Sequence, residues 1–429
     1  MTTDSVAYDM TRLLLGLNSP TPNGIDRVDL CFARHYLGSP QYRRTAIVLN
    51  RLRPWCIEPD AAMAVLAQVE GHWRENVDTG DDSTFHLVRN AIISRPSGGG
   101  GKTHAKRVVS RPAGRSRYMT KAAWTLLSQL PRALFSAVPD NGVFFHTTHF
   151  PSSLMFKWLQ NRPHMRAVFF IHDLLPIKFP EFFTEHNQQA HRRSLDVLVR
   201  YGSGVIVNSQ EVRNEIQRFL EKNGKLDFPI LVAPIPADAT FSMRGPVDAE
   251  LAAHPYFVVC GTIEPRKNHL MLLNVWRELV RQDGANAPKL IVIGKRGWKN
   301  ENVVDILERS TAMESHVVEV SGLSTAAMKH IVANARALLV PSFVEGYCLP
   351  MVEALALGTP VIASDIAVFR DIGKDRCAYL SPIDGLGWLD TVRSYSERST
   401  WKAEAQEPGG QPTLPEYFAR IDRFLCTLP

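Results

Sequence analysis

Two glutamates in the second half of the chain lie on a segment that could hold both a phosphate and hydroxyl groups. Glu345 and Glu353 belong to PSFVEGYCLPMVEAL, which follows the apolar stretch Ala337–Val340. Gly346 permits a tight backbone path, and Pro350 is expected to start a helix with Glu353 in its first turn. Backbone N–H groups at a helix start can receive phosphate, and carboxylates bind vicinal hydroxyls. Each glutamate also has an explanation that involves no ligand. Glu353 could complement the dipole at the start of the helix, and Glu345 could be an exposed charge on a loop.

Positive charge follows two other expected strands. The segment GTIEPRKNH begins at Gly261, and its Arg266 and Lys267 supply fixed charge that would suit a diphosphate. A solvated basic turn, with a glycine required for packing, is the alternative. The segment GKRGW around Lys295 could admit a nucleotide base beside its tryptophan, or it could be a plain turn.

Apolar segments alternate with helical periodicity, which favours parallel sheets covered by helices on both faces. The expected strands of the first half are Thr11–Leu17, Thr45–Asn50, Gly142–His149, Ala167–Asp173 and Gly204–Asn208. Those of the second half are Tyr256–Thr262, Lys289–Gly294, Val317–Ser321, Ala335–Pro341, Pro360–Ser364 and Ala378–Leu380. Such sheets bind ligands beyond the carboxyl ends of their strands, where the residues above are expected to lie.

The expected fold class is α/β, with two doubly wound parallel-sheet domains facing each other across a cleft. The first domain is expected at 1–235 and the second at 256–385. Residues 236–255 are rich in Pro, Asp and small residues, so they are interpreted as the linker. The tail, 386–429, ends in an expected helix that would pack back toward the first domain.

Composition limits the classes of protein. The 429 residues are 45% hydrophobic and 21% charged, which is typical of a globular protein and excludes disorder, collagen and coiled coil. No stretch approaches the ~18 apolar residues of a membrane span, and no signal peptide is expected. Six scattered cysteines without metal spacing favour the reducing cytosol. No Asp-X-Asp triplet is present, so no metal is expected in the site.

Residues 95–121 form the most unusual segment, with eight Lys/Arg and no acidic residue. A P-loop is excluded, because Pro96 occupies the position of its first glycine. An amphipathic stretch begins at Trp124, so this region could rest peripherally on an anionic membrane surface, at the inner face of the membrane. A solvated loop before an ordinary core helix is the alternative. Tyr118 is the only aromatic residue among the basic ones, which argues against nucleic acid.

GTIEPRKNH and PSFVEGYCLPMVEALALGTPVIASD together closely resemble the retaining GT-B glycosyltransferases of family 4, whose hallmark is two glutamates separated by seven residues. The segments FFIHDLLPIKFPE at 169–181, VNS at 207–209 and NGIDR at 23–27 are also similar to that family. The resemblance is strong over 256–370 and patchy before it, and it does not account for 51–140 or the tail.

The resemblance implies roles for individual residues. Glu345 would bind the transferred sugar, Glu353 the ribose, and Lys267 with Arg266 the diphosphate. Many relatives carry an arginine where this chain has Thr262, so Arg266 is expected to compensate. The expected donor-binding residues are Gly24, Asp173, Gly261, Thr262, Lys295, Gly346, Tyr347, Cys348, Leu349 and Glu353.

His172 would lie near the anomeric carbon of the sugar, and Gly24 would line the cleft opposite the donor. Alternatively, His172 is a histidine at a strand end whose ring is hydrogen-bonded within the protein and has no role in the reaction. Fixed cations and helix starts would replace a metal, since cleavage of a nucleotide–sugar bond develops charge that preorganised groups can stabilise.

The resemblance therefore implies a cytoplasmic, retaining, metal-independent glycosyltransferase of bacterial surface-polysaccharide synthesis. GDP-mannose is the first expected donor and a UDP-sugar the second, with a glycan or a lipid-linked molecule as acceptor. A catalytically inactive nucleotide-sugar-binding partner in a polysaccharide-assembly complex is the alternative.

Overall fold

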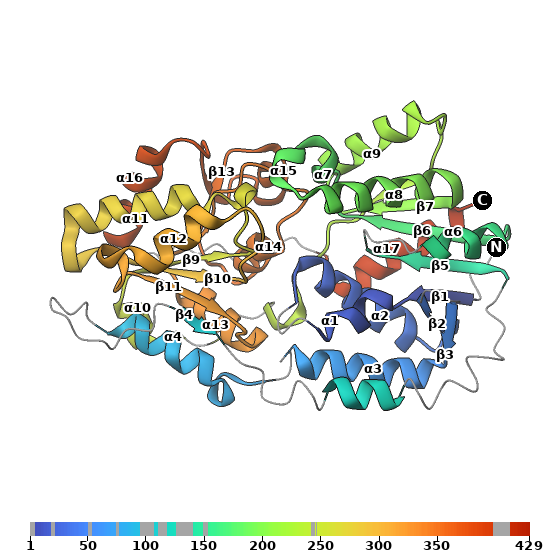
Figure 1. The fold of residues 1–429 in the computed structure, drawn as a ribbon, viewed down its shortest axis with the longest axis horizontal. Coiled ribbons are helices and arrows are strands. Elements are labelled where there is room, and N and C mark those ends of the chain that lie inside the picture. Colours follow the sequence, from blue (N-terminus) through green and yellow to red (C-terminus); the bar gives the residue numbers. More distant parts are fainter. Residues whose placement is uncertain are drawn as a thin grey trace. The chain divides into compact units, whose positions relative to one another are not determined.

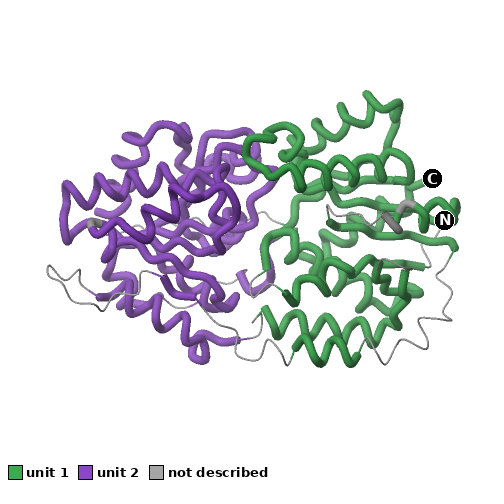
Figure 2. Tube along the Cα trace, in the orientation of Figure 1, with its two compact units in different colours: residues 1–73, 112–236, 412–429 green, residues 74–111, 237–411 purple. Residues whose placement is uncertain are grey.

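The computed structural model describes residues 5–18, 22–49, 54–73, 77–94, 107–109, 118–125, 140–148, 153–241, 245, 247–397 and 412–429. The chain divides into two compact units (Figure 2). Unit 1 comprises residues 1–73, 112–236 and 412–429, and unit 2 comprises residues 74–111 and 237–411. The expected domain boundaries differ from this division, because the chain contributes residues 74–111 to unit 2 before it completes unit 1.

Unit 1 is built on a sheet with the strand order β3-β2-β1-β5-β6-β7-β8 among the described residues (Figure 1). The strands are β1 Ser5–Asp9, β2 Arg43–Leu49, β3 Pro54–Ile57, β5 Gly142–His146, β6 Met165–Ile171, β7 Gly202–Val207 and β8 Ile230–Val232. All pairings are parallel except that of the edge strand β3 with β2. The chain runs outward from β1 through β2 and then crosses to β5 on the other side, so β1 and β5 form a topological switch point.

Helices cover both faces of this sheet. They are α1 Thr11–Gly16, α2 Gly24–Gly38, α3 Pro59–His72, α6 Ser153–Gln160, α7 Leu175–Lys178, α8 Glu185–Tyr201, α9 Gln210–Lys222 and α17 Leu414–Thr427. Residues of α6, α8 and α9 share one apolar core with the sheet. On α2, Phe32 lies 5.5 Å from Phe170 of β6 and 5.3 Å from Phe418 of α17 between ring centroids. Aromatic packing therefore holds α17 in unit 1.

The expected strand Thr11–Leu17 is wrong, because these residues form α1 and the strand precedes them. Asp9 ends β1, and its Oδ1 accepts a hydrogen bond from the Thr11 backbone nitrogen at 3.0 Å. This local bond turns the chain into the helix, and a short run of leucines is compatible with either element.

Unit 2 is built on an all-parallel sheet with the order β14-β13-β12-β9-β10-β11-β4 among the described residues. The strands are β4 Arg107–Val109, β9 Tyr256–Cys260, β10 Lys289–Ile293, β11 Val317–Ser321, β12 Ala337–Val340, β13 Val361–Ser364 and β14 Cys377–Leu380. The helices are α4 Ser83–Ile93, α10 Ala249–Ala253, α11 His269–Asp283, α12 Glu301–Arg309, α13 Thr325–Asn334, α14 Leu349–Ala356, α15 Ala367–Gly373 and α16 Gly385–Glu397. The order reverses between β9 and β12, which makes that pair the switch point of unit 2.

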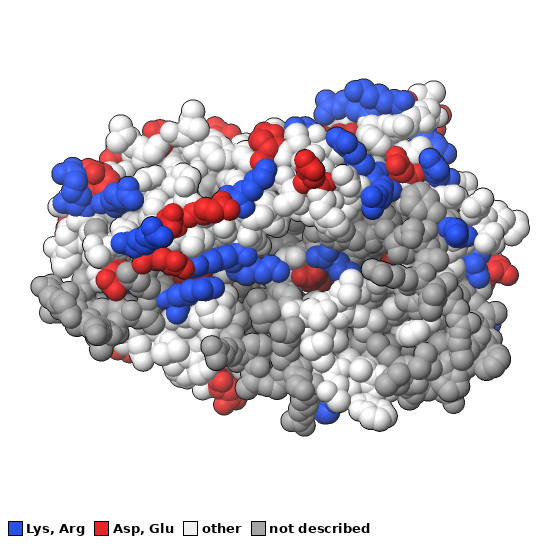
Figure 3. Space-filling model, in the orientation of Figure 1, with Lys and Arg blue, Asp and Glu red and all other residues white. Residues whose placement is uncertain are grey.

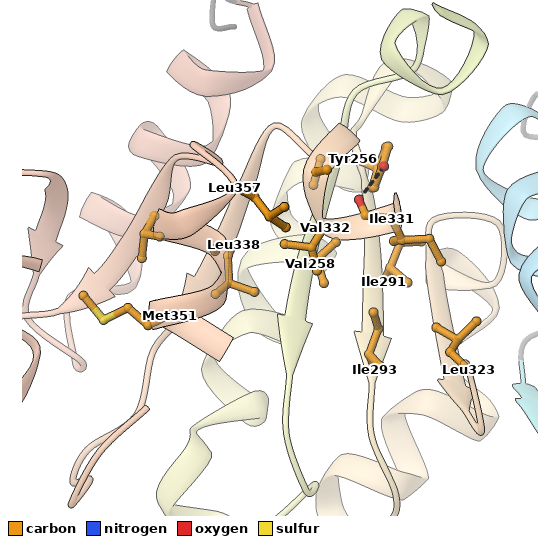
Figure 4. Packing of buried hydrophobic residues seen from close by; sticks show 14 of the residues in the cluster. Tyr256, Val258, Ile291, Ile293, Leu323, Ile331, Val332, Leu338, Met351 and Leu357 are labelled. Carbon is orange, nitrogen blue, oxygen red and sulfur yellow. Dashed lines mark hydrogen bonds between the residues drawn. The ribbon is translucent and has the colours of Figure 1, made fainter. Parts of the chain in front are cut away.

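Side chains along the strands of unit 2 alternate between two cores. Tyr256 and Val258 of β9 face the core formed with α4, α13, α14 and α15, whereas Phe257 and Val259 face the core formed with α11, α12 and α16. Figure 4 shows the first core, in which the Tyr256 hydroxyl donates a 2.7 Å hydrogen bond to the Ile331 carbonyl. The strands are apolar on both faces because helices cover both.

Residues 74–111 are integrated into unit 2 by specific polar contacts. Asp82 caps α4 by accepting from the Thr84 nitrogen at 2.9 Å, and its other oxygen accepts from the Ser324 nitrogen at 2.8 Å. The buried Lys289 ammonium donates to the main-chain oxygens of Ala91 and Ser94. β4 then adds a strand beside β11.

The prediction that residues 236–255 form a linker is wrong, because the segment contains short helices and contributes to a core. It contains the short helices η3 Ala239–Phe241 and α10, and Phe241 and Leu251 are fully buried in a core of unit 2. Apolar residues spaced without a regular period therefore still supply core contacts.

The other 3-10 helices among the described residues are η1 Thr79–Asp81, η2 Pro180–Phe182, η4 Pro265–Lys267, η5 Gly284–Asn286 and η6 Thr311–Met313.

Most of the basic segment 95–121 lies outside the described residues, as does most of the stretch that follows Trp124. On the face shown in Figure 3, the described Lys and Arg side chains are interspersed with Asp and Glu. Among the helices that the structure describes, none combines the length and the apolar character needed to cross a bilayer.

Candidate functional site

The carboxyl ends of β9 and β12 bring two distant segments together at the switch point of unit 2. The Phe343 backbone nitrogen donates to the Arg266 carbonyl at 2.8 Å, and the Asn268 amide donates to the Pro341 carbonyl at 3.1 Å. Asn268 has φ 57°, a left-handed conformation that asparagine tolerates, and it lies between η4 and α11. These bonds hold the loop after β9 against the loop after β12.

Arg266, Lys267 and Glu345 form an ion cluster at this point. Glu345 Oε2 lies 2.5 Å from Arg266 Nη1, and its Oε1 lies 2.5 Å from Lys267 Nζ. Ser342 donates to the same Oε1 at 2.9 Å, and Glu264 pairs with Arg266 Nη2 at 2.8 Å. Three of the predicted site residues are therefore brought together, whereas Glu264 and Ser342 were missed.

Acidic side chains hold the two cations of the cluster in place. Burial alone would raise the pKa of Glu345, but the charges of Arg266 and Lys267 and their hydrogen bonds lower it below its usual range. The carboxylate is therefore ionised, and together with Glu264 it pairs with two cations that are themselves mostly buried. Cations held in place before a ligand arrives can stabilise charge that develops on a phosphate without reorganising.

Two glycines allow the backbone to approach closely beneath Lys267. Gly261 has φ 143°, and a Cβ there would lie 3.4 Å from Lys267 Cε. A Cβ on Gly294 would lie 1.9 Å from the Gly261 carbonyl oxygen, so the turns after β9 and β10 are in direct contact. Gly261 is thus favoured by its positive φ, and Gly294 by the close approach of the Gly261 carbonyl.

Replacing Gly261 by alanine is expected to lower the free energy of unfolding by about 1–3 kcal/mol, because the residue must keep a positive φ. Urea unfolding followed by circular dichroism measures the change. Gly385→Ala is the matched control, since a Cβ there would meet nothing within 4 Å and its φ is unstrained. Equal midpoints for the two variants would show that Gly261 is not conformationally required.

The helix after Glu345 begins earlier than expected. α14 starts at Leu349 with Cys348 as its N-cap, so Pro350 lies inside the first turn and Glu353 follows that turn. The expectation that Glu353 belongs to the first turn is therefore wrong, and dipole complementarity explains this buried carboxylate poorly. Burial raises the pKa of the Cys348 thiol to about 12, so it is a neutral packing group.

The remaining predicted residues of unit 2 occupy distinct environments. Gly346 is buried, Tyr347 and Leu349 are half-buried, and burial raises the pKa of the Tyr347 hydroxyl. Thr262 is half-buried, and a Cβ on Gly297 would lie 2.7 Å from its methyl group.

Lys295 is exposed beyond β10. Its neighbour Arg296 pairs with both oxygens of Glu319 at 2.8 and 2.7 Å and with Glu308 at 2.5 Å. These ion pairs hold Arg296 within the protein, so Lys295 is the cation of the GKRGW segment that meets solvent.

The other predicted site residues belong to unit 1. His172 follows β6, is buried, and lies 2.8 Å through Nε2 from the Thr147 carbonyl oxygen. Burial lowers the pKa of His172 to about 3, so the ring is neutral. Asp173 Oδ1 accepts from the Leu175 nitrogen at 3.0 Å, and Gly24 is exposed as the first residue of α2.

Sequence reasoning missed a buried polar cluster at the switch point of unit 1. Tyr8, Asp29 and Thr147 are joined by hydrogen bonds, and Asp9 beside them lies 2.9 Å from His146 Nδ1. These residues are up to 139 positions apart. No local pattern could have united them.

No group of three or more His, Cys, Asp or Glu side chains with the arrangement of a metal site occurs within the described ranges.

The fold is that of the GT-B glycosyltransferases, with two α/β units on parallel sheets. Anabaena HepE in complex with UDP and glucose superposes with a TM-score of 0.58 over 99% of this chain and 100% of that one, at 14% identity. A point mutant of S. aureus TarM, in complex with fondaparinux, alpha-GlcNAc-glycerol and UDP, superposes with a TM-score of 0.53 over 67% of this chain and 56% of that one, at 15% identity.

Residues 254–392, which contain the ion cluster, match the family Glycosyl transferases group 1. The chain is also 28% identical over 231 residues to the serotype-specific mannosyltransferase WbdA of Escherichia coli, which covers 50% of this chain and 28% of WbdA. It is 27% identical over 234 residues to O-antigen chain mannosyltransferase B of Escherichia coli, covering 52% of this chain and 59% of that protein. The chain thus spans less than two thirds of the length of these relatives.

Proposed function

We propose that the chain is a retaining, metal-independent glycosyltransferase that moves a hexose from a nucleotide-sugar donor to a glycan or lipid-linked acceptor. The observation that carries this proposal is the Arg266–Lys267–Glu345 cluster at the switch point of unit 2, inside the segment that matches group 1 glycosyl transferases. Open α/β sheets bind ligands at such a point.

Each member of the cluster has a proposed task. Lys267 and Arg266 neutralise the diphosphate as it leaves, which is the task of a metal in other sites. Glu345 leaves its two cations in part and binds hydroxyls of the sugar, and Glu353 binds the ribose. His172 is proposed to act on the sugar, as the family resemblance implies, and retention is likewise taken from that resemblance.

GDP-mannose is the proposed donor and a UDP-sugar the second choice. The names of the mannosyltransferase relatives support mannose as the sugar. The structure of HepE, which shares the fold, contains UDP and glucose and supports a UDP-sugar as the second choice. The relatives include O-antigen enzymes, which favours a surface polysaccharide as the product. Action in the cytoplasm, at the inner face of the membrane, is part of the same proposal.

A nucleotide-sugar-binding partner without activity is the second candidate. It would use the same ion cluster to bind the donor, and it would release no nucleotide. Turnover therefore separates the two functions, whereas binding alone does not.

The test is nucleotide release by purified full-length chain from GDP-mannose, UDP-glucose, ADP-glucose and dTDP-glucose, with and without EDTA. Slow release from one donor, unchanged by EDTA, is the expected result. Loss of release in EDTA would overturn metal independence. Release from no donor, with a thermal shift by a nucleotide, would favour the inactive partner. Neither release nor a thermal shift would contradict both functions.

A further inference from the structure

Residues 74–111 lie outside the segment that matches group 1 glycosyl transferases, yet they reach the carboxyl ends of the strands of unit 2. Asp82, which precedes α4, is fully buried. Its Oδ1 accepts from the backbone nitrogens of Thr84 and Phe85 at 2.9 and 3.3 Å and so caps α4. Its Oδ2 accepts from the backbone nitrogen of Ser324 at 2.8 Å, 242 positions away in the sequence. One carboxylate therefore ties α4 to a distant turn.

The cap alone does not explain this carboxylate. A serine would cap α4 about as well as an aspartate does. It would also avoid the cost of burying a carboxylate. The second oxygen of Asp82, which accepts from Ser324, is the feature that a cap does not require.

The turn that Asp82 holds lies directly beyond the carboxyl end of β11. It comprises residues 322–324, between β11 and α13. Leu323 of this turn is buried in the same core as Phe85 of α4. Phe85 also packs edge-on against His330 of α13, with ring centroids 5.2 Å apart, and α4 lies beside α13 (Figure 1). The turn therefore shares a core with α4 in addition to its bond with Asp82.

The neighbouring turn, after β10, is hydrogen-bonded on both sides. The Gly294 nitrogen donates to the Val320 carbonyl of β11 at 2.9 Å. On the other side, the Ile263 nitrogen donates to the Lys295 carbonyl at 2.9 Å, and the Gly297 nitrogen donates to the Ile263 carbonyl at 3.0 Å. Backbone bonds therefore connect the carboxyl ends of β9, β10 and β11.

The order of the strands indicates which part of a nucleotide sugar would meet each turn. Four adjacent strands have the order β12-β9-β10-β11. In the proposed function, the sugar lies at Glu345 after β12 and the diphosphate at Lys267 after β9. A donor that extends along this edge has its nucleoside beyond β10 and β11, which is ~10 Å or two strand spacings from β9. The turn at 322–324 is therefore expected to meet the nucleoside.

We propose that Asp82 is a positioning residue that fixes the turn after β11, where the nucleoside of the donor binds. The donor-binding role rests on the proposed function. The hold of Asp82 on the turn does not depend on that function, because it concerns only contacts within unit 2.

Two variants of the full-length chain test the proposal. In Asp82→Ser, the hydroxyl can cap α4 but has no second oxygen to accept from Ser324. Thr413→Ala is the matched control, because it removes the N-cap of α17 in unit 1 and alters no residue of unit 2. A thermal melt of both variants confirms folding.

Hydrogen–deuterium exchange followed by mass spectrometry tests the hold on the turn without any ligand. In Asp82→Ser, peptides that cover residues 322–327 are expected to exchange roughly tenfold faster, because the Ser324 amide loses its acceptor. Peptides of α4 are expected to exchange as in the wild type, and Thr413→Ala to change neither region. Wild-type exchange over 322–327 in Asp82→Ser would overturn the proposal.

Calorimetric titration with GDP, UDP and inorganic diphosphate tests the donor-binding role. Inorganic diphosphate can bind the cations but has no nucleoside. Asp82→Ser is therefore expected to raise the Kd of the preferred nucleotide about tenfold, the scale of one lost hydrogen bond to a charged group, and to leave the Kd of diphosphate unchanged. An unchanged nucleotide Kd, or an equal rise for both ligands, would overturn the positioning role.

A wild type that binds neither nucleotide would contradict the proposed function, and the donor-binding role of Asp82 would fail with it. The exchange experiment would still decide whether Asp82 holds the turn. Failure of the proposed function is thus distinguished from failure of this inference, in which the wild type binds a nucleotide and Asp82→Ser binds it equally well.

With an active donor, Asp82→Ser is expected to raise the donor KM about tenfold and to keep kcat within about twofold of the wild type, because a nucleoside is bound equally before and during sugar transfer. Thr413→Ala is expected to change neither constant. A lower kcat with an unchanged KM in Asp82→Ser is the result expected of partial unfolding, and it would contradict a positioning role.

Discussion

Lys267→Ala is expected to reduce nucleotide release by roughly 10²–10³-fold, the usual effect of removing one preorganised group that stabilises developing charge. The ammonium lies 2.5 Å from Glu345 Oε1 and over the turn at Gly261, so it is held before the donor binds. In the proposed reaction, only Arg266 would then remain to neutralise the leaving diphosphate. Release from the active donor, measured at saturating and at low concentration, gives both kcat and kcat/KM.

The matched control for this prediction is Lys225→Ala, which removes an exposed lysine of unit 1. It is expected to leave turnover within twofold of the wild type, as for a surface substitution. Near-normal turnover by Lys267→Ala would contradict the assignment of the diphosphate site. A thermal melt of both variants is needed, because Lys267→Ala also removes one partner of a buried carboxylate and can lower stability.

Glu345→Ala is expected to abolish measurable release and to destabilise unit 2 by about 3–5 kcal/mol, the usual cost of removing one partner from a buried ion pair. The carboxylate is 4% exposed and bonds both cations and Ser342. Its loss leaves Arg266 and Lys267 close together with Glu264 as the remaining acidic partner. Urea unfolding and nucleotide release measure the two effects.

The same residue predicts a dependence of stability on pH. The pKa of Glu345 is lower in the folded chain than in the unfolded chain, where it is near 4.5. Its contribution is therefore present above that value and is lost as pH falls through the lower folded pKa. The Glu345→Gln variant is expected to lack this acid-dependent loss, whereas Glu397→Gln, which alters an exposed residue at the end of α16, is expected to keep it. Identical acid profiles for the two variants would show that Glu345 is not ion-paired.

Local patterns were sufficient for much of unit 2. The expected strand at Val317–Ser321 matches β11 residue for residue, and the expected strand at Lys289–Gly294 overlaps β10. Continuous apolar runs bounded by turn residues are typical of strands covered on both faces, and these strands are. The candidate residues Arg266, Lys267 and Glu345 could be chosen for the same reason, because they follow such strands.

Local patterns failed where two structures share one pattern or where pairing partners are distant. The leucines of α1 fitted a strand equally well, and β4 is a three-residue strand that is recognised only by its pairing with β11. Phe241 and Leu251 stand in a segment without periodicity, yet both are buried. Nothing in residues 74–111 themselves shows that they complete the second sheet.

The amino-acid sequence was therefore enough to establish the α/β class, the order of most strands and helices along the chain, and which charged residues follow strands. Those properties depend on short-range periodicity and on the chemistry of single side chains. The contact of Arg266 with Glu345, 79 residues away, and that of Tyr8 with Thr147, 139 residues away, arise only from the order of strands in the two sheets. Strand order is settled by long-range pairing and burial, so both clusters could be found only in the folded chain.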